Sequence, residues 1–140
     1  MPDRNKVLTV ISEWVIKAEN DLTTAAHTLK LGGDCPTDTV CFHAQQCVEK
    51  YLKALLVWKQ APFPKTHDIG VIIALVPVEL RPDLTPEEVR RLTKYGTVIR
   101  YPGDDEPILL TAARRAVKLA RRVRGAVRRL LPKGSLLRRR

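Results

Sequence analysis

Four polar side chains that can bind ligands recur in the segment between residues 37 and 60. They are His43, Gln46, Lys50 and Lys53, at spacings of three, four and three. In a helix these spacings bring side chains to one face. Such a face suits the binding of a nucleotide or contact with a second protomer, and a solvated flank is the alternative. Glu49 lies four residues before Lys53, the spacing of a favourable ion pair on a helix.

A second group of binding residues is the basic end of the chain. Residues 108–140 hold 12 of the 25 Lys and Arg and no Asp or Glu, so the rest of the chain has a net charge of −2. An apolar face that starts at Leu109 lies opposite a basic face. The basic face comprises Arg114, Arg115, Lys118, Arg121, Arg122, Arg128 and Arg129. It is suited to tracking phosphates, and a solvated face that suits the helix dipole is the alternative. Twelve cations without an acid favour contact with a polyanion.

Three more residues are candidates for a site. Arg100 precedes a tight loop, where it either contacts a phosphate or helps to cap the carbonyls of the preceding helix. Tyr101 either stacks on a base or anchors the loop. Asp21 either orients a cation on the 37–60 helix or is an ordinary surface carboxylate.

The cysteines and the missing motifs restrict the chemistry. The chain has an odd number of cysteines, Cys35, Cys41 and Cys47, and no CxxC pair. Neither a disulfide framework nor a metal site is therefore expected. We expect Cys41 and Cys47 to pack in the core, as thiols do in a reducing compartment. No glycine-rich phosphate loop or dinucleotide fingerprint is present, so no cofactor is predicted. Without a signal sequence or an apolar run of about 20 residues, we expect a cytoplasmic protein that does not enter membranes.

The elements that position these residues are helices. Apolar residues at alternating spacings of three and four predict helices over 4–31, 37–60, 67–76, 86–99 and 108–131. The expected N-caps are Thr37 or Asp38, then Thr66, then Thr85 with Glu88 completing a capping box. No alternating strand pattern appears. The sequence therefore predicts an all-α, antiparallel up-down four-helix bundle with one short extra helix. A single domain over 1–132 would be followed by a basic tail over 133–140.

Two runs within this pattern carry a family resemblance. Residues 41–56 (CFHAQQCVEKYLKALL) and the turn at 64–69 (PKTHDI) resemble the second helix and following turn of prokaryotic HEPN proteins (higher eukaryotes and prokaryotes nucleotide-binding). The runs 14–22 (WVIKAENDL) and 100–102 (RYP) are similar to the corresponding parts of the first helix and of the segment before the last. The resemblance covers roughly residues 10–131 and implies a helical bundle.

The resemblance also implies a set of functions. Many HEPN proteins are metal-independent ribonucleases that act as toxins beside a minimal nucleotidyltransferase antitoxin. Their active pattern is an Arg followed, after four to six residues, by a His, and two copies meet in a homodimer. An Arg can bind the scissile phosphate bidentately, and a His can move the proton of the 2′-hydroxyl.

This chain departs from that active pattern. Arg100 is present, but the positions for the His hold Asp105, Glu106 and Pro107, and no His follows His67. The chain resembles an Arg-Tyr-Pro branch of the family that is associated with binding. We therefore expect a homodimer that binds nucleotide or RNA beside a nucleotidyltransferase, through Arg100, Tyr101 and the polar face of the 37–60 helix. A ribonuclease using Arg100 and a module that docks an acidic protein are the alternatives.

Overall fold

The computed structural model describes residues 3–97, 102 and 107–136. Five α-helices occur in this part of the chain: α1 (Arg4–Leu29), α2 (Thr37–Trp58), α3 (Ile69–Ala74), α4 (Pro86–Thr97) and α5 (Leu110–Leu130). Three short 3-10 turns accompany them: η1 (Gly32–Asp34), η2 (Val78–Leu80) and η3 (Lys133–Ser135). No strand occurs among the described residues, so the all-α prediction is confirmed.

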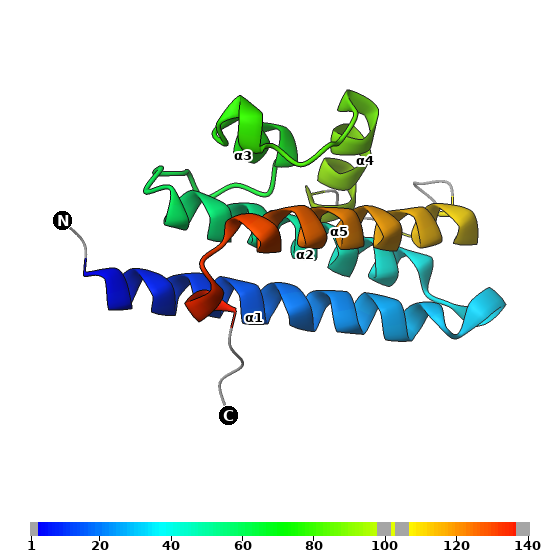
Figure 1. Ribbon diagram of the computed structural model, residues 1–140. Helices are drawn as coiled ribbons and strands as arrows, with labels where there is room; N and C mark the ends of the chain where they lie inside the picture. Colours follow the sequence, from blue (N-terminus) through cyan, green and yellow to red (C-terminus); the bar gives the residue numbers. More distant parts are fainter. Residues whose placement is uncertain (1–2, 98–101, 103–106, 137–140) are drawn as a thin grey trace.

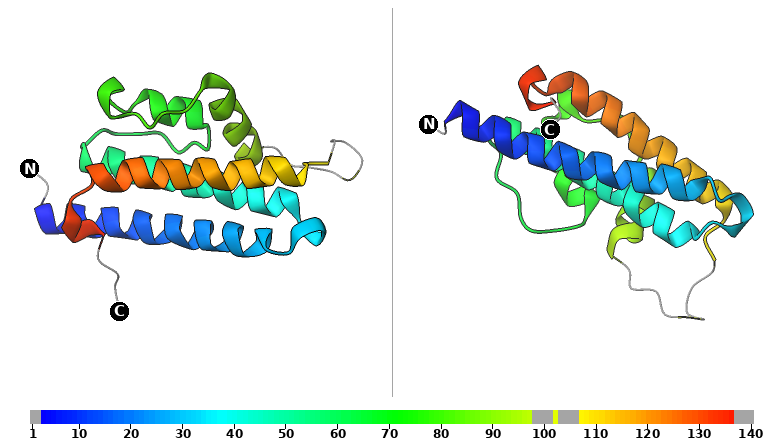
Figure 2. Two further views of the ribbon diagram at one scale, coloured as in Figure 1. Left: turned by 45° about the vertical axis from the view of Figure 1, so that its right-hand side comes forward. Right: turned by 90° about the horizontal axis from the view of Figure 1, so that it is seen from below.

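Three long helices form the body of the molecule. Figures 1 and 2 show α1, α2 and α5 side by side, with α1 running in the opposite direction to the other two. The shorter α3 and α4 lie together on one side of α2, and α4 is inclined to the long helices (Figure 1). Among the long helices, α2 is therefore antiparallel to α1 and α5 is parallel to α2, while α3 and α4 pack against α2 and against each other.

The central helix of the fold is α2. Fourteen of its 22 residues are buried, and it packs against α1, α3, α4 and α5. Its largest fully buried apolar side chains include Leu52, Leu55 and Leu56. Burying a Leu side chain is worth about 1.5–3 kcal/mol. The apolar side of α2 is therefore a main source of stability for the bundle.

The cysteines belong to the core, as expected for Cys41 and Cys47. All three lie in the described part of the chain, are buried and form no disulfide. Burial raises the pKa of the Cys47 thiol, and the nearby carboxylates of Glu19 and Asp21 add to that effect. The thiol is therefore protonated at neutral pH and behaves as a small hydrophobic side chain.

The start of α2 differs from the prediction. Neither Thr37 nor Asp38 is the N-cap, because the helix begins at Thr37 and Pro36 is the cap residue without a side-chain bond. The Thr37 hydroxyl instead donates to the carbonyl of Ile108 at 2.8 Å. This bond joins the first turn of α2 to the segment that leads into α5.

The start of α3 also differs from the prediction. The helix begins at Ile69, and its N-cap is Asp68 rather than Thr66. The Asp68 carboxylate accepts hydrogen bonds from the amides of Gly70 and Val71, at 2.8 and 3.2 Å. The Thr66 hydroxyl accepts from the Asp68 amide and so shapes the turn before the helix.

The capping box of α4 is confirmed. The Thr85 amide donates to Glu88 Oε1 at 2.9 Å, and the Glu88 amide donates to Thr85 Oγ1 at 3.1 Å. The bond from the Thr85 amide holds the pKa of Glu88 below its usual value. The predicted end of this helix, at residues 98 and 99, lies outside the described residues.

The two ends of α5 are tied to the rest of the bundle in different ways. Leu109 is the N-cap residue and is 70% exposed. Contrary to the prediction, it does not belong to the buried apolar face of the helix. After α5, residues 133–136 of the expected basic tail turn back onto α1. Ser135 is buried, and its carbonyl accepts a bond from the Ser12 hydroxyl at 2.7 Å. Residues 137–140 lie outside the described part of the chain.

One close approach fixes α4 against α2. A methyl group added at Gly96 would overlap the carboxamide of Gln45, a side chain with no exposed surface. That carboxamide cannot turn away freely, because it donates to the His67 carbonyl and to Glu49. Glycine is therefore required at position 96 by the packing of the two helices.

We expect Gly96→Ala to lower the free energy of unfolding by about 1–2 kcal/mol, since overpacking costs about 1–3 kcal/mol and the better helix propensity of Ala returns up to about 1 kcal/mol. Urea unfolding measures the difference. The control is Gly125→Ala in α5, where the added methyl group would meet only the end of Arg129 at 3.7 Å. This variant should be as stable as the parent or more stable. Equal effects of the two substitutions would contradict the close approach.

Candidate nucleic-acid interface and the polar network of α2

The polar side chains of α2 separate into a surface pair and a buried group. His43 and Lys50 form the surface pair, and both contact Asp21 of α1. The distance from His43 Nδ1 to Asp21 Oδ1 is 2.8 Å, and Lys50 Nζ donates to Asp21 Oδ2 at 2.6 Å. Because a carboxylate oxygen accepts hydrogen bonds, the contact places a hydrogen on His43 Nδ1 and leaves Nε2 for solvent or a ligand. The expectation that Asp21 orients a cation on this helix is confirmed.

Lys53 belongs to the buried group. Its side chain is 8% exposed, and its ammonium group donates to Glu49 Oε2 at 3.1 Å and to the Thr66 carbonyl at 3.2 Å. The same ammonium lies 5.6 Å from the ring centre of Trp14 and 5.8 Å from that of Phe63. These rings cover Lys53, so it does not extend the surface formed by His43 and Lys50.

Gln46 is also internal. It donates to Gln45 Oε1 at 2.7 Å, and Gln45 donates in turn to Glu49 Oε1 at 3.2 Å. His67 Nδ1 lies 2.8 Å from the same oxygen of Glu49. The result is a continuous network in which a nearly buried carboxylate receives bonds from both sides. Gln45 and Lys53 also donate to the carbonyls of His67 and Thr66 and so hold α2 to the turn after it, while Gln46 supports Gln45.

The expected ion pair between Glu49 and Lys53 is confirmed, but its setting is the interior. The two side chains are 3% and 8% exposed. An exposed pair at this spacing contributes about 0.3–0.5 kcal/mol. A buried carboxylate instead requires its partners, since removing one partner of a buried pair costs about 3–5 kcal/mol.

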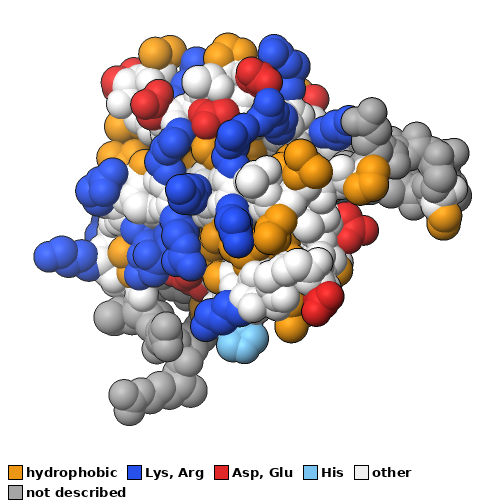
Figure 3. Space-filling model, turned by 90° about the vertical axis from the view of Figure 1, so that its right-hand side faces the viewer, with side chains coloured by type: hydrophobic (Ala, Val, Ile, Leu, Met, Phe, Trp, Pro, Cys, Tyr) orange, Lys and Arg blue, Asp and Glu red, His pale blue; other side chains and the backbone are white. Residues whose placement is uncertain are grey.

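The cations of α5 divide into exposed and partnered residues. Five of the expected basic face are exposed and form no ion pair with a described acidic residue: Arg114, Arg115, Lys118, Arg121 and Arg129. We call these five the α5 stripe. Arg122 instead pairs with Glu88 of α4 at 3.3 Å and donates to the Asp83 carbonyl. Figure 3 shows Lys and Arg side chains gathered in one band on the face that it draws.

Arg128 differs from the rest of the expected basic face, because it points toward α1. Together with Arg124, it donates to Glu19 Oε1, at 3.0 and 2.8 Å. The buried Tyr51 hydroxyl donates to the same oxygen at 2.8 Å and accepts a bond from Arg128. Burial raises the pKa of Tyr51, so its hydroxyl remains a donor at neutral pH.

Glu19 and Arg124 were not predicted to belong to a cluster. Two signals were present. Arg124 lies three residues after Arg121 and four before Arg128, at the edge of the basic face. Tyr51 lies in an apolar stripe, where a buried hydroxyl needs a hydrogen-bond partner.

Several expected residues cannot be placed. Arg100, Tyr101, Asp105 and Glu106 lie outside the described residues. Over the described ranges, no group of three or more His, Cys, Asp or Glu side chains could hold a metal ion. The helices described also include none that is long and apolar enough to cross a membrane.

Comparison with protein-family models decides the family. The model of the HEPN domain matches residues 11–130, which is most of the chain. The chain belongs to the HEPN family. Comparisons with curated proteins and with solved structures found no match. The matched range runs from α1 to the end of α5, so the Asp21 contacts, the Glu49 network and the α5 stripe are all parts of the HEPN domain. HEPN is a family of proteins whose functions involve nucleotides or RNA.

We expect Glu49→Gln to lower the free energy of unfolding by about 3 kcal/mol, because the ammonium of Lys53 would remain buried without its counter-charge. Glu87→Gln is a matched control, since Glu87 also pairs with a cation four residues later, Arg91, but with side chains 63% and 44% exposed. It should cost no more than about 0.5 kcal/mol. Urea unfolding compares the two. Similar small losses in both variants would show that the Glu49 network contributes little.

Proposed function

We propose that this HEPN protein is a cytoplasmic binder of RNA or nucleotide that does not cleave RNA. The observation that carries the proposal is the α5 stripe, in which five cations face solvent without an acidic partner among the described residues. From Arg114 to Arg129 the stripe spans about 22 Å at the helical rise of 1.5 Å per residue. That length suits a series of backbone phosphates.

The helix dipole does not account for this stripe. Cations are stabilised in the last turn of a helix, and the effect decays within that turn. Arg114 and Arg115 lie in the second turn of α5, close to its positive end. Lys118 also lies three or four residues from several like charges, a spacing at which equal charges repel. A bound polyanion would relieve this repulsion, whereas a purely structural role would not require it.

His43 and Lys50 are the second proposed contact region, with Arg100 and Tyr101. Asp21 holds both side chains in place, so a ligand would meet a preorganised imidazole and ammonium. The exposed Phe42 ring lies edge-on to His43 at 5.3 Å and offers an apolar surface beside them. Aromatic side chains of this kind are platforms for bases.

The triple variant Arg114→Gln/Lys118→Gln/Arg121→Gln tests the stripe. If five phosphates are contacted, log K of the parent should fall with log[salt] with a slope of about −3.5 on single strands and −4.5 on duplex. The variant should bind more weakly and reduce that slope by about 2–3. Fluorescence anisotropy with a labelled RNA pool at several salt concentrations measures both quantities.

A matched control for this experiment is Lys6→Gln/Lys17→Gln/Lys30→Gln. It removes the same charge from exposed positions on α1 and at its C-cap, Lys30. Affinity and slope should stay close to those of the parent. Equal losses in the two triple variants would mean that binding depends on net charge alone. If the parent protein does not bind the RNA pool, the proposal is wrong and the alternative, docking of an acidic protein, is favoured.

The same RNA pool, incubated in chelator, also tests cleavage. The RNA should remain intact, because no His follows His67 and the positions for the family's His hold other residues. Cleavage that Arg100→Ala abolishes would identify a ribonuclease and refute the binding-only proposal.

Membership of the HEPN family supports two finer parts of the proposal, a homodimer and a minimal nucleotidyltransferase partner in a toxin–antitoxin-like module. Light scattering at micromolar concentration should give twice the chain's mass of 15.8 kDa. Co-expression with a nucleotidyltransferase from a neighbouring gene should yield a complex. A monomer would remove any site shared between protomers, and the absence of such a gene or complex would remove the module.

A further inference from the structure

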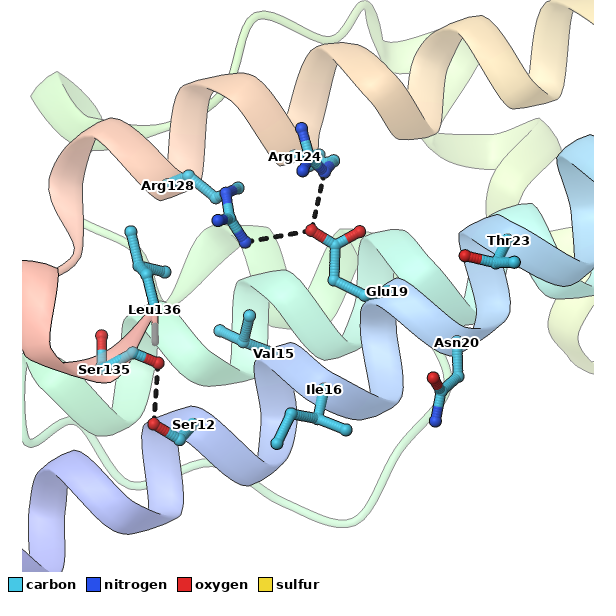
Figure 4. Close-up of a pocket in the computed structure, with 10 residues that line it drawn as sticks. All are labelled: Ser12, Val15, Ile16, Glu19, Asn20, Thr23, Arg124, Arg128, Ser135 and Leu136. Atoms are coloured by element: carbon cyan, nitrogen blue, oxygen red, sulfur yellow. Dashed lines mark hydrogen bonds and ion pairs between the residues drawn. The ribbon is translucent and has the colours of Figure 1, made fainter. Parts of the chain in front are cut away.

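A pocket of about 360 Å³ lies between α1, α5 and η3, apart from the α5 stripe and from the Asp21 contacts. One wall carries Glu19 with Arg124 and Arg128 (Figure 4). η3 closes one end of it, where the Ser12 hydroxyl binds the Ser135 carbonyl. Its volume lies at the small end of the range for pockets that bind ligands, about 300–1,000 Å³.

The two guanidinium groups at this pocket have unused donors. A guanidinium carries five N–H donors. Arg124 donates through Nε to Glu19 and also interacts with the Tyr51 hydroxyl, and Arg128 donates through Nη1 to Glu19 and Tyr51. Most of the N–H groups of the two side chains thus have no partner among the described residues. Both side chains are partly exposed, at 39% and 27%, so a ligand can reach these donors.

The charge of this cluster favours an anion. Two guanidinium groups face a single carboxylate, which leaves a local charge of about +1. Three groups donate to Glu19 Oε1: the two guanidinium groups and the buried Tyr51 hydroxyl. Glu19 therefore holds both guanidinium groups in position without occupying their remaining N–H groups.

The rest of the lining favours an apolar body. Val15 and Ile16 of α1 and Leu136 after η3 line the pocket together with the polar side chains of Asn20 and Thr23 (Figure 4). Asn20 and Thr23 are exposed, and their side chains form no hydrogen bond with the described residues. A ligand with a charged end and a short apolar body would satisfy both kinds of surface.

We propose that this pocket binds a small anion with an apolar body, its carboxylate or phosphate monoester group bridging Arg124 and Arg128. The apolar body lies against Val15, Ile16 and Leu136, and Asn20 and Thr23 form the rim. The site is separate from the proposed RNA surface, because these two guanidinium groups point toward α1 whereas the α5 stripe faces solvent. Either proposal can fail without the other, since the test below uses no RNA.

Four probes test the site on the ¹⁵N-labelled full chain: hexyl phosphate, hexanoate, hexanol and inorganic phosphate. Titration by NMR should shift the side-chain Nε–H signal of Arg124 and the amides of Asn20 and Thr23 with at least one of the two amphiphilic anions. The anion that binds identifies the charged group. Hexanol should cause no shift, and inorganic phosphate should bind at least about tenfold more weakly, because it lacks the apolar body.

Arg124→Gln should weaken binding about tenfold or more, as expected for loss of a hydrogen bond to a charged group. Lys17→Gln removes the same charge from an exposed position on α1 that does not line the pocket, and should leave binding unchanged. Absence of shifts with both anions would overturn the proposal. Equal weakening by the two substitutions, or shifts spread over the α5 stripe, would also overturn it.

A blocking variant covers the case in which Arg124→Gln fails to fold. Asn20→Trp places a large side chain at the rim from an exposed position and removes no member of the Glu19 cluster. Its thermal unfolding should match that of the parent, whereas binding of the anion should be abolished. Undiminished binding by Asn20→Trp would refute the assignment to this pocket.

Discussion

The arrangement of this bundle depends on the buried carboxylate of Glu49, whose side chain is 3% exposed. A carboxylate withdrawn from water without partners would cost several kcal/mol. Three side chains from two parts of the chain remove that cost: Gln45 and Lys53 on α2, and His67 in the turn after it. Lys53 and Gln45 bind the carbonyls of Thr66 and His67 as well, so the same network fixes the turn that leads to α3. The lack of a side chain at Gly96 lets α4 approach this network closely.

The two carboxylates of α1 decide which cations remain available for binding. Glu19 and Asp21 are two residues apart, so they point about 200° from each other around the helix. Glu19 holds Arg124 and Arg128 of α5 and also accepts a bond from Tyr51 of α2, whereas Asp21 holds His43 and Lys50 of α2. Part of the basic charge of the chain is thus used to attach α5 to α1. The α5 stripe is the part of the expected basic face that faces solvent without an acidic partner among the described residues, and it is narrower than the sequence indicates.

The helices and the family could be predicted from the sequence, because both depend on local patterns. The spacing of apolar residues located all five helices, and the box of Thr85 and Glu88 marked the start of α4. The cap of α3 was missed because Thr66 and Asp68 are both good capping residues, and only the backbone geometry selects between them. The burial of Lys53 could not be predicted for a different reason. Helical spacing shows which side chains share a face, but Trp14 and Phe63, which cover this one, come from separate segments of the chain.

The same limit explains the division of α5, and it has an electrostatic consequence. By spacing alone, Arg128 is equivalent to the exposed cations, since nothing local indicates that Glu19 lies opposite it. Arg124 and Arg128 are four residues apart and would repel each other, but a shared carboxylate oxygen lies between them. Arg114 and Lys118 have the same spacing without such an anion among the described residues. One part of the helix is therefore partly neutralised internally, whereas the charges of the other part have no such counter-charge among the described residues. An anion supplied by a partner would do for Arg114 and Lys118 what Glu19 does for Arg124 and Arg128.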